Sequence, residues 1–336
     1  QEEITPLIHQ AIRLDEEDPI SSEQLTEFTQ LLEEELEKLN QDIEETPIKG
    51  KDERKTHRRK LKKILRKIKD DFSVRAEKYE NYQETFEGRN SFSKTDPDAT
   101  FMRMKEDHMK NGQLKAAYNL QIATENQFVL HYDIYPNPTD TRTLLPFLET
   151  YPHELKRVVA DAGYGSEENL LTLNRMGVDH LIKYGLFDKE QKKNYKESDR
   201  NLDNWTYDET TDTYTHPEGW VYQFDHLKHS HTTTGFRQEI RVYKAEQSDL
   251  APQKGLYVNK RYQLLKVKES QALLSDEGSH IFAQRKVDVE PVFGQIKACL
   301  GYKRCNLRGK RQVKIDMGLV LMANNLLKYN KRTTQN

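Results

Sequence analysis

The chain has 336 residues, of which 35% are hydrophobic and 32% are charged, and its formal net charge is −2 at pH 7. This length provides for one large or two medium domains and excludes a single small module. The two cysteines, Cys299 and Cys305, exclude a disulfide scaffold and a four-cysteine zinc site, so a reducing cytoplasm is expected. The sequence has no run of about 18 apolar residues, so no membrane-spanning helix is predicted. The first residue is Gln rather than Met, which suggests a segment of a longer protein.

Residues 20–85 predict an antiparallel helical hairpin. Ser21 and Gln24 form a capping box before the first helix, and the sequence TPIKGK separates it from the second. Apolar residues recur at helical spacing in both helices, at Leu25, Phe28, Leu32, Leu36 and Leu39 and then at Leu61, Ile64, Leu65 and Ile68. Residues 1–90 are therefore expected to form a helical, coiled-coil-like segment.

From residue 91 onward, short strands alternate with helices. The predicted elements are strands over 98–104, 116–124 and 127–135, a helix over 139–151 opened by a Thr-Asp cap, a strand over 157–164, a helix over 166–177, and a strand over 178–185. Ser166 caps the second of these helices, and Gly177 closes it. This alternation predicts an α/β layer over residues 91–186 in which the later strands are parallel.

Residues 187–268 interrupt this layer with a pattern typical of β-hairpins. Aromatic residues recur among turn-forming residues, at Trp205, Tyr207, Tyr214, Trp220, Tyr222 and Phe224. We expect them to form the core of a β-rich insertion, although a platform for stacking nucleic-acid bases is an alternative. Two helices, over about 270–299 and 311–329, are predicted within the last segment, residues 269–336.

Asp161 ends the apolar stretch RVVA and is the first candidate for chemistry. In an open α/β sheet, ligands bind beyond the carboxyl ends of the strands, where a carboxylate is accessible while the sheet holds its backbone. Gly163 and Gly165 follow, and such small residues let backbone or substrate come close. A local role for Asp161, as a cap of the following helix or in an ion pair, is the alternative.

Glu290, in the sequence RKVDVEPVFGQIK, is the second acidic candidate. Arg285 lies five residues before it and Lys297 seven residues after it, so a simple ion-pair cluster is one explanation. The other explanation pairs Glu290 with Asp161. Carboxylates from separate elements can bind two Mg²⁺ ions about 3.5–4 Å apart, which promote displacement at phosphorus.

The last fifty residues are strongly basic. From residue 286 onward, only three acidic residues accompany a series of cations, which are Lys286, Lys297, Lys303, Arg304, Arg308, Lys310, Arg311, Lys314, Lys328, Lys331 and Arg332. Such a bias next to a candidate metal site favours binding of a phosphate backbone. For the basic helix over residues 51–69, a solvated face and a DNA contact stay equally open.

Two further groups of residues are expected to have no role in metal binding. His226, His229 and His231 lie close together in sequence, but the neighbouring Thr and Gly residues favour a hairpin edge. Cys299 and Cys305 are expected to be free thiols, one of them buried.

Three motifs together resemble the DDE transposases of bacterial insertion sequences, in the branch with long helical and β-rich insertions. They are VVADAGYGSEENL, AQRKVDVEPVFGQIKACLGYKRCNLRG and VKIDMGLVLMANNLLKY, with SFSKTDPDATFMRMKEDHMKNGQLKAAYNLQIAT ahead of them. The resemblance implies an α/β fold with a ribonuclease-H-like mixed sheet flanked by helices, a helical-hairpin insertion and a β-rich insertion. It also implies cleavage and transfer of DNA strands, dependent on Mg²⁺ or Mn²⁺, at the terminal inverted repeats of the element.

The resemblance assigns roles to individual residues. Asp161 matches the second catalytic aspartate and Glu290 the catalytic glutamate, both as metal ligands. Arg285 resembles the arginine before that glutamate, with Phe282 where the family often has Tyr, and Lys297 matches the lysine after it. Because the spacing is looser than in the family, Arg285 and Lys286 stay alternatives. The resemblance implies that these cations hold phosphates of the DNA end, bound by a homodimer in the bacterial cytoplasm.

One departure from the family concerns the first catalytic aspartate. Relatives carry it in an Asp-Gly-Thr sequence on the first strand of the core, upstream of the helical insertion, and this chain has no such sequence. Asp96 and Asp98 are the nearest substitutes, although they match a different segment. We therefore expect a transposase segment with little activity of its own. The alternatives are an inactive DNA-binding remnant and a metal-dependent nuclease that recruits Asp96 or Asp98.

Overall fold

The computed structural model describes residues 20–104, 112–246, 251 and 253–334. Its internal contacts divide the chain into two compact units, residues 1–92 and residues 93–336. Within the described residues, no helix is long and apolar enough to cross a membrane. The predicted segment 1–90 includes residues 1–19, which lie outside the described residues.

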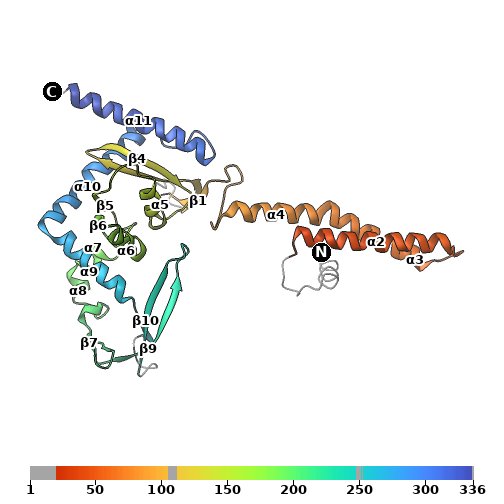
Figure 1. The fold of residues 1–336 in the computed structure, drawn as a ribbon, viewed down its shortest axis with the longest axis horizontal. Coiled ribbons are helices and arrows are strands. Elements are labelled where there is room, and N and C mark those ends of the chain that lie inside the picture. Colours follow the sequence, from red (N-terminus) through yellow and green to blue (C-terminus); the bar gives the residue numbers. More distant parts are fainter. Residues whose placement is uncertain (1–19, 105–111, 247–250, 252, 335–336) are drawn as a thin grey trace. The chain divides into compact units, whose positions relative to one another are not determined.

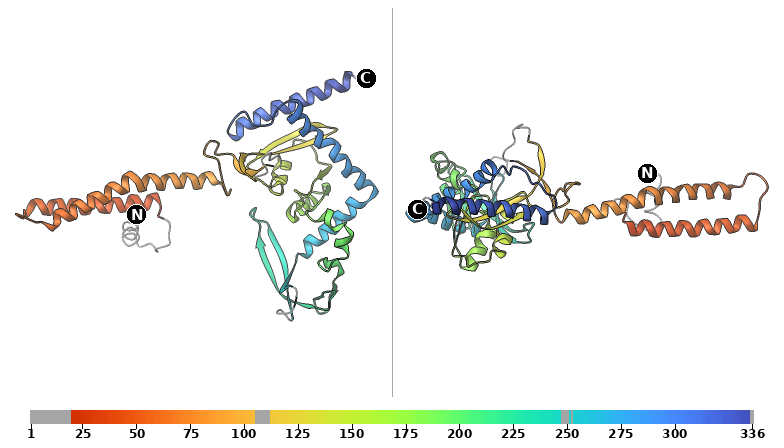
Figure 2. Two further views of the ribbon diagram at one scale, coloured as in Figure 1. Left: turned by 180° about the vertical axis from the view of Figure 1, so that it is seen from behind. Right: turned by 90° about the horizontal axis from the view of Figure 1, so that it is seen from above.

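The first unit contains the predicted helical hairpin (Figures 1 and 2). Its elements are α2 Ser22–Glu45, α3 Glu53–Lys67, the π-helix η1 Ile68–Phe72 and α4 Ser73–Phe86. The capping box is confirmed, since Ser21 Oγ accepts from the Gln24 backbone and the Gln24 side chain accepts from Ser21 N. The predicted apolar positions pack together, with Leu25, Phe28, Leu32, Leu61 and Ile68 buried in one cluster.

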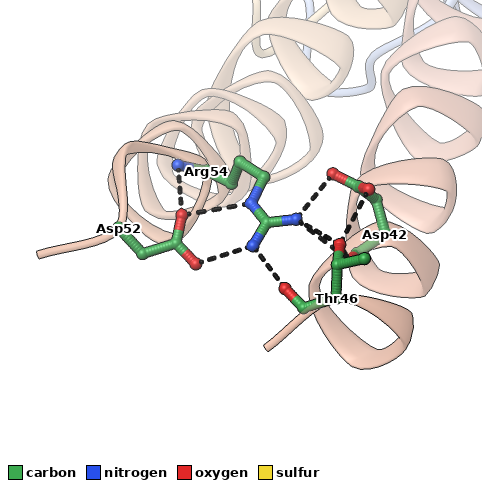
Figure 3. A network of polar contacts seen from close by, with 4 residues as sticks. All are labelled: Asp42, Thr46, Asp52 and Arg54. Carbon is green, nitrogen blue, oxygen red and sulfur yellow. Dashed lines mark hydrogen bonds and ion pairs between the residues drawn. The ribbon is translucent and has the colours of Figure 1, made fainter. Parts of the chain in front are cut away.

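Arg54 clamps the turn of this hairpin (Figure 3). Its Nη1 donates to the carbonyl and the carboxylate of Asp42, each over 3.0 Å, and its Nη2 donates to the Thr46 carbonyl over 2.6 Å. Its Nε donates to Asp52, whose carboxylate also caps α3 through the Arg54 backbone. One guanidinium therefore binds the end of α2 to the start of α3. The hydrogen bond from Arg54 is the main reason why the pKa of Asp52 is lowered.

We expect Arg54→Met to loosen this turn. Hydrogen exchange at residues 42–54 should become faster, whereas Lys63→Met, an exposed cation removed from the same helix, should leave it unchanged. Because the pKa of Asp52 is lowered, the clamp stabilises the folded state above the ordinary pKa of Asp and is lost as the pH falls below about 4. The difference between Arg54→Met and the native chain should therefore shrink in acid. Equal exchange in both chains at neutral pH would contradict the clamp.

The second unit is a mixed α/β assembly. Its strands are β1 Thr100–Arg103, β2 Leu114–Ala117, β3 Asn119–Glu125, β4 Phe128–Tyr135, β5 Arg157–Ala160, β6 Asp179–Ile182, β7 Thr206–Asp208, β8 Thr213–Thr215, β9 Val221–His231, β10 Arg237–Ala245 and β11 Gly255–Val258. Its helices are η2 Asp140–Arg142, α5 Leu144–Glu149, α6 Glu167–Met176, α7 Phe187–Glu190, α8 Lys193–Lys196, η3 Leu202–Asn204, α9 Lys260–Leu274, α10 Asp276–Gly294, η4 Gln295–Cys299 and α11 Lys310–Thr334.

Two small sheets form the centre of this unit. β3 and β4 pair antiparallel, and β5 and β6 pair parallel, as predicted for the later strands. A single apolar cluster contains residues of both sheets, with Ala123 and Tyr135 from the first and Val158, Ala160 and Ile182 from the second. The two sheets therefore share one core, although no backbone pairing joins them among the described residues.

The predicted strand over 116–124 is wrong in one respect, because it is divided at Tyr118. β2 pairs with β1, whereas β3 pairs with β4 in a different sheet. Tyr118 donates from its hydroxyl to Asp96 over 2.8 Å, which fixes the chain between the two strands. The predicted helix over 139–151 is also shorter than expected, since only the 3₁₀ turn η2 and the six residues of α5 are helical.

The β-rich insertion forms one antiparallel sheet in the order β11-β10-β9-β8-β7. Trp205, Tyr214, Tyr222 and Tyr243 are buried in its core, which confirms a structural role for most of the predicted aromatic run. The long β9–β10 hairpin is prominent in Figure 1. Helical structure resumes earlier than predicted, at Lys260, because Asn259 caps α9, and it breaks at Ser275, which caps α10.

A buried carboxylate joins the insertion to the central sheets. Glu167, in the first turn of α6, is 2% exposed and accepts from Gln238 on β10, from Asn259 and from Arg261 on α9. Close to this contact, Thr234 at the hairpin tip donates to Glu168. The β9–β10 hairpin and the start of α9, both distant in sequence, are thus fixed to the helix that follows Asp161.

Candidate active site

Asp161 directly follows β5, and its side chain is 43% exposed. Its Oδ1 accepts from the backbone of Gly163 over 3.0 Å. The cap of α6 is Ser166, whose hydroxyl accepts from Asn169 N, so Asp161 is not needed for that purpose. The carboxylate therefore stands at the carboxyl end of a parallel strand and still faces solvent, as a ligand-binding group in an α/β sheet does.

Asp140 is the residue that sequence reasoning missed. It lies five residues after β4, at the first position of η2, and its carboxylate approaches Gly163 as that of Asp161 does. A Cβ atom built on Gly163 would lie 2.9 Å from Asp140 Oδ2 and 3.1 Å from Asp161 Oδ1. Two carboxylates from the ends of two different strands therefore converge over this glycine, and the lack of a side chain there makes their approach possible.

A relay of polar side chains from β3 holds Asp140 in this position. Asn119 Nδ2 and Gln121 Nε2 both donate to Asp140 Oδ1, over 2.8 and 3.1 Å. The Tyr164 hydroxyl in turn donates to Gln121 Oε1, which leaves the amide nitrogen of Gln121 to face Asp140. Burial raises the pKa of Tyr164, and the negative charges of Asp140 and Asp161 raise it further, so the phenol remains a donor.

Gly165 has a different role from Gly163. A Cβ atom on Gly165 would overlap the Lys183 carbonyl oxygen and approach the Tyr184 Cα, both of which belong to the segment after β6. The Gly165 carbonyl accepts from the Tyr262 hydroxyl over 2.8 Å. The sequence predicted a close approach here, and the structure shows that the approaching group is the backbone of the next strand connection.

Helix α10 carries Arg285, Lys286 and Glu290, which were also assigned to the site. Arg285 is the residue that reaches Asp161, with its Nη1 4.0 Å from Asp161 Oδ2 and its side chain 18% exposed. Its guanidinium also lies over the ring of Phe282, 5.6 Å from the centroid. Glu290 is exposed, and five residues of helix turn it about 140° around the axis from Arg285.

Asp96 and Asp98 bind the start of α11. Asp96 Oδ1 accepts from Gly309 N over 3.1 Å, and Asp98 Oδ2 accepts from Lys310 N over 2.7 Å. A carboxylate at the N-terminus of a helix satisfies an unpaired N–H group and interacts favourably with the helix dipole, which contributes about 1 kcal/mol. Both residues therefore have a structural task that does not involve Asp161.

This capping places the basic segment near the carboxylates. The described basic residues outside α10 that were assigned to DNA gather around the loop before α11 and its first turn, and most are exposed, including Lys303, Arg304, Arg308, Lys310 and Arg311. The Lys310 ammonium lies 5.8 Å from the centre of the Tyr135 ring, at the end of β4. Tyr135 pairs with Asn119, which holds Asp140. The cations and the two carboxylates thus lie at the same end of the central sheets. Lys286 and Lys297 are exposed on α10 and η4.

The other candidates of the sequence do not form a second centre. His226 contacts Asp225, and His229 contacts Arg237, on an exposed part of the β9–β10 hairpin. Both cysteines are free and exposed, so the prediction that one is buried is wrong.

The groups around Gly163 are carboxylates, which suit a divalent cation, but there are only two of them among the described residues. Carboxylate oxygens are the ligands that Mg²⁺ and Mn²⁺ prefer. Within the part of the chain that the structure describes, however, no three side chains of His, Cys, Asp or Glu are close enough to hold a metal ion. Asp140 and Asp161 supply two carboxylates, and Arg285 compensates part of their charge.

A family model described as Transposase DDE domain matches residues 90–326. The chain belongs to this transposase family. The match contains both converging carboxylates, helix α10 and most of α11, so the site just described lies inside the transposase domain. No curated protein and no solved structure matches the chain.

The two glycines of the transposase site should respond differently to an added methyl group. Gly165→Ala forces backbone atoms apart and should lower the free energy of unfolding by about 2–3 kcal/mol. Gly163→Ala meets side-chain atoms of Asp140 and Asp161 and no backbone, so it should lower that free energy by less than about 1 kcal/mol while it pushes the carboxylates apart. Chemical denaturation of the two variants checks this order, and a larger loss for Gly163→Ala would contradict the geometry.

Proposed function

We propose that this transposase domain cleaves and transfers DNA strands at the ends of an insertion sequence, in a reaction that depends on Mg²⁺ or Mn²⁺. The observation that carries the proposal is the convergence of Asp140 and Asp161 over Gly163, at the carboxyl ends of two strands of a DDE transposase domain. Hard oxygen ligands at such a position suit a metal that activates phosphoryl transfer.

The proposal includes a ribonuclease-H-like sheet that one further strand completes. Among the described residues, β3 pairs only with β4 and β5 pairs only with β6, so β3 and β5 each have one edge without a strand partner. Both strands pack into the same apolar cluster. A strand between them would join the two sheets into one and would bring its own carboxylate beside Asp161. The Asp-Gly-Thr sequence of relatives is the segment we assign to that strand.

Asp161 is the ligand on which the proposed metal site depends, with Asp140 beside it. Glu290 is kept as a proposed ligand on the family resemblance alone, because in the structure it lies on a different side of α10 from Arg285. Mg²⁺ or Mn²⁺ bound there would stabilise charge on a phosphate and lower the pKa of a bound water or 3′-hydroxyl group. Neighbouring side chains would support this metal site. Asn119 and Gln121 orient Asp140, and Arg285 offers a cation to a phosphate near Asp161.

The basic residues at the same end of the sheets are the proposed contacts to double-stranded DNA. Lys303, Arg304, Arg308, Lys310 and Arg311 provide five cations within nine residues, near the end of β4. Phosphate contacts of this kind fix the position of a duplex without reading its sequence. They would hold the terminal inverted repeat and the target DNA while the carboxylates face the scissile phosphate.

A second candidate function is DNA binding without catalysis, by a remnant of a transposase. It is favoured by the lack of a three-carboxylate group within the described residues. The third alternative, a nuclease that recruits Asp96 or Asp98, is disfavoured because both carboxylates cap α11.

Extending the chain at its N-terminus with an Asp-Gly-Thr strand separates the first two functions. We expect residues 1–336 to bind transposon-end DNA but to cleave it poorly, and the extended chain to cleave it with Mg²⁺. In the extended chain, Asp161→Asn and Glu290→Gln should each lower the cleavage rate more than about 100-fold, beyond the loss typical of an outer-shell residue. Asp288→Asn, which removes an acid from the same helix as Glu290, is the matched control. An extended chain that binds DNA and never cleaves it would support the remnant instead.

A further inference from the structure

Asn169 connects the two turns that carry the converging carboxylates. Its side-chain nitrogen, Nδ2, donates to the Thr141 carbonyl over 3.0 Å and to the Tyr164 carbonyl over 2.8 Å. Thr141 directly follows Asp140, and Tyr164 lies three residues after Asp161. Asn169 itself is only 1% exposed. One buried amide group therefore binds the backbone of both turns.

The helix α6 does not require this side chain for its own start. Asn169 lies in the first turn of α6, where its backbone N–H donates to the hydroxyl of the capping residue Ser166 over 3.2 Å. Any residue other than proline supplies such a backbone donor. The side-chain NH₂ group has two hydrogens to donate, and it uses both on carbonyls outside α6. The contact with the turns, and not the cap, therefore explains why an amide side chain stands at this position.

Thr141 provides a second connection between the turns. Its hydroxyl donates to the Gly163 carbonyl over 3.0 Å, and the Gly163 N–H donates to the Asp161 carboxylate over 3.0 Å. A series of contacts thus leads from the residue after Asp140, through Gly163, to Asp161. Whereas Asn169 is buried, Thr141 is exposed, so its hydroxyl can be removed without opening the core.

These side-chain contacts matter because no strand pairing fixes the two turns. Within the described part of the chain, β4 pairs only with β3 and β5 pairs only with β6, so the strands that lead to Asp140 and Asp161 are not neighbours. Two carboxylates that lie close together repel each other, and turns that could move would let them separate. Gln121 orients the Asp140 side chain, whereas Asn169 holds the backbone beside it.

We propose that Asn169 is a positioning residue which, together with Thr141, sets the separation of the Asp140 and Asp161 carboxylates. Its consequence for metal binding rests on the proposed function, because a divalent cation requires its oxygen ligands at defined distances. Asn169 acts through the backbone of the two turns and not as a ligand. Loss of such an outer hydrogen-bonding partner typically weakens metal binding by about 10- to 100-fold.

A measurement without metal tests the separation. In the full chain with Cys299→Ser and Cys305→Ser, the changes Asp140→Cys and Asp161→Cys place thiols at the two carboxylate positions. Dibromobimane becomes fluorescent when it bridges two thiols, so its fluorescence reports how fast the positions are joined. We expect roughly 10-fold slower bridging when Asn169→Ala is added, because misplaced groups react more slowly.

The matched control is Asn174→Ala, which should leave the bridging rate unchanged. Asn174 lies on the same helix, but its side chain bonds the Leu170 carbonyl within α6 and Lys268 on α9. Circular dichroism checks that each variant keeps its fold. Thr141→Val, which removes an exposed hydroxyl, should also slow the bridging, and it decides alone should Asn169→Ala unfold. Folded variants of Asn169 and Thr141 that bridge at the native rate would overturn the proposal, as would an unchanged rate in Thr141→Val where Asn169→Ala does not fold.

Binding of Mn²⁺ by residues 1–336 separates this inference from the proposed function. The electron paramagnetic resonance signal of the free ion decreases as Mn²⁺ binds. We expect a dissociation constant about 10-fold higher in Asn169→Ala than in the native chain, and no change in Asn174→Ala. Equal affinity in the native chain and in folded Asn169→Ala would contradict the effect on the metal site. If the native chain bound no Mn²⁺ while Asn169→Ala still slowed the bridging, the metal site of this segment would be rejected and the positioning role retained.

Discussion

The arrangement of the site depends on the hydrogen-bond relay Tyr164–Gln121–Asp140. No strand pairing joins the β3–β4 and β5–β6 sheets within the described residues, so this relay is a polar connection between them directly beneath the candidate site. The relay fixes the orientation of the Gln121 side-chain amide, because the amide oxygen accepts from Tyr164 and the amide nitrogen donates to Asp140. A buried polar network that is satisfied in this way specifies one geometry, whereas a broken one would leave buried groups unpaired.

Acidic and basic residues lie at the same end of the second unit for separate structural reasons. Asp96 and Asp98 are used by the start of α11, which in turn fixes the basic loop near the end of β4. Asp161 keeps one oxygen bound to Gly163 and the other near Arg285. Two of these acidic residues thus hold the start of α11, whereas Asp140 and Asp161 converge over Gly163 and the side chain of Asp161 is 43% exposed. This division supports a metal site at Asp140 and Asp161 over one that recruits the earlier pair.

The sequence predicted the features that depend on local chemistry. The Ser21–Gln24 capping box, the Ser166 cap and the Gly177 stop of α6 each involve residues a few positions apart, and all are present. The parallel pairing of β5 and β6 followed from the helix between them. The division at Tyr118 was missed because it depends on a bond to Asp96, 22 residues away.

Asp140 was missed for the same reason. The sequence indicated a local Thr-Asp cap, but the carboxylate is held by Asn119 and Gln121, 21 and 19 residues earlier. Asp140 follows a predicted strand by a few residues, as Asp161 follows another, and this position is the signal in the sequence that could have identified it.

Cleavage of the backbone by bound Fe²⁺ tests most directly whether Asp161 belongs to a divalent-metal site. Fe²⁺ with ascorbate and peroxide generates radicals that cut the chain close to the metal, and mass spectrometry of residues 1–336 locates the cuts. If Asp161 belongs to such a site, cuts are expected near Asp140 and near residues 161–164, suppressed by excess Mg²⁺ and lost in Asp161→Asn. Cuts confined to another region, such as the histidines of the β9–β10 hairpin, or an unchanged pattern in Asp161→Asn, would contradict that assignment.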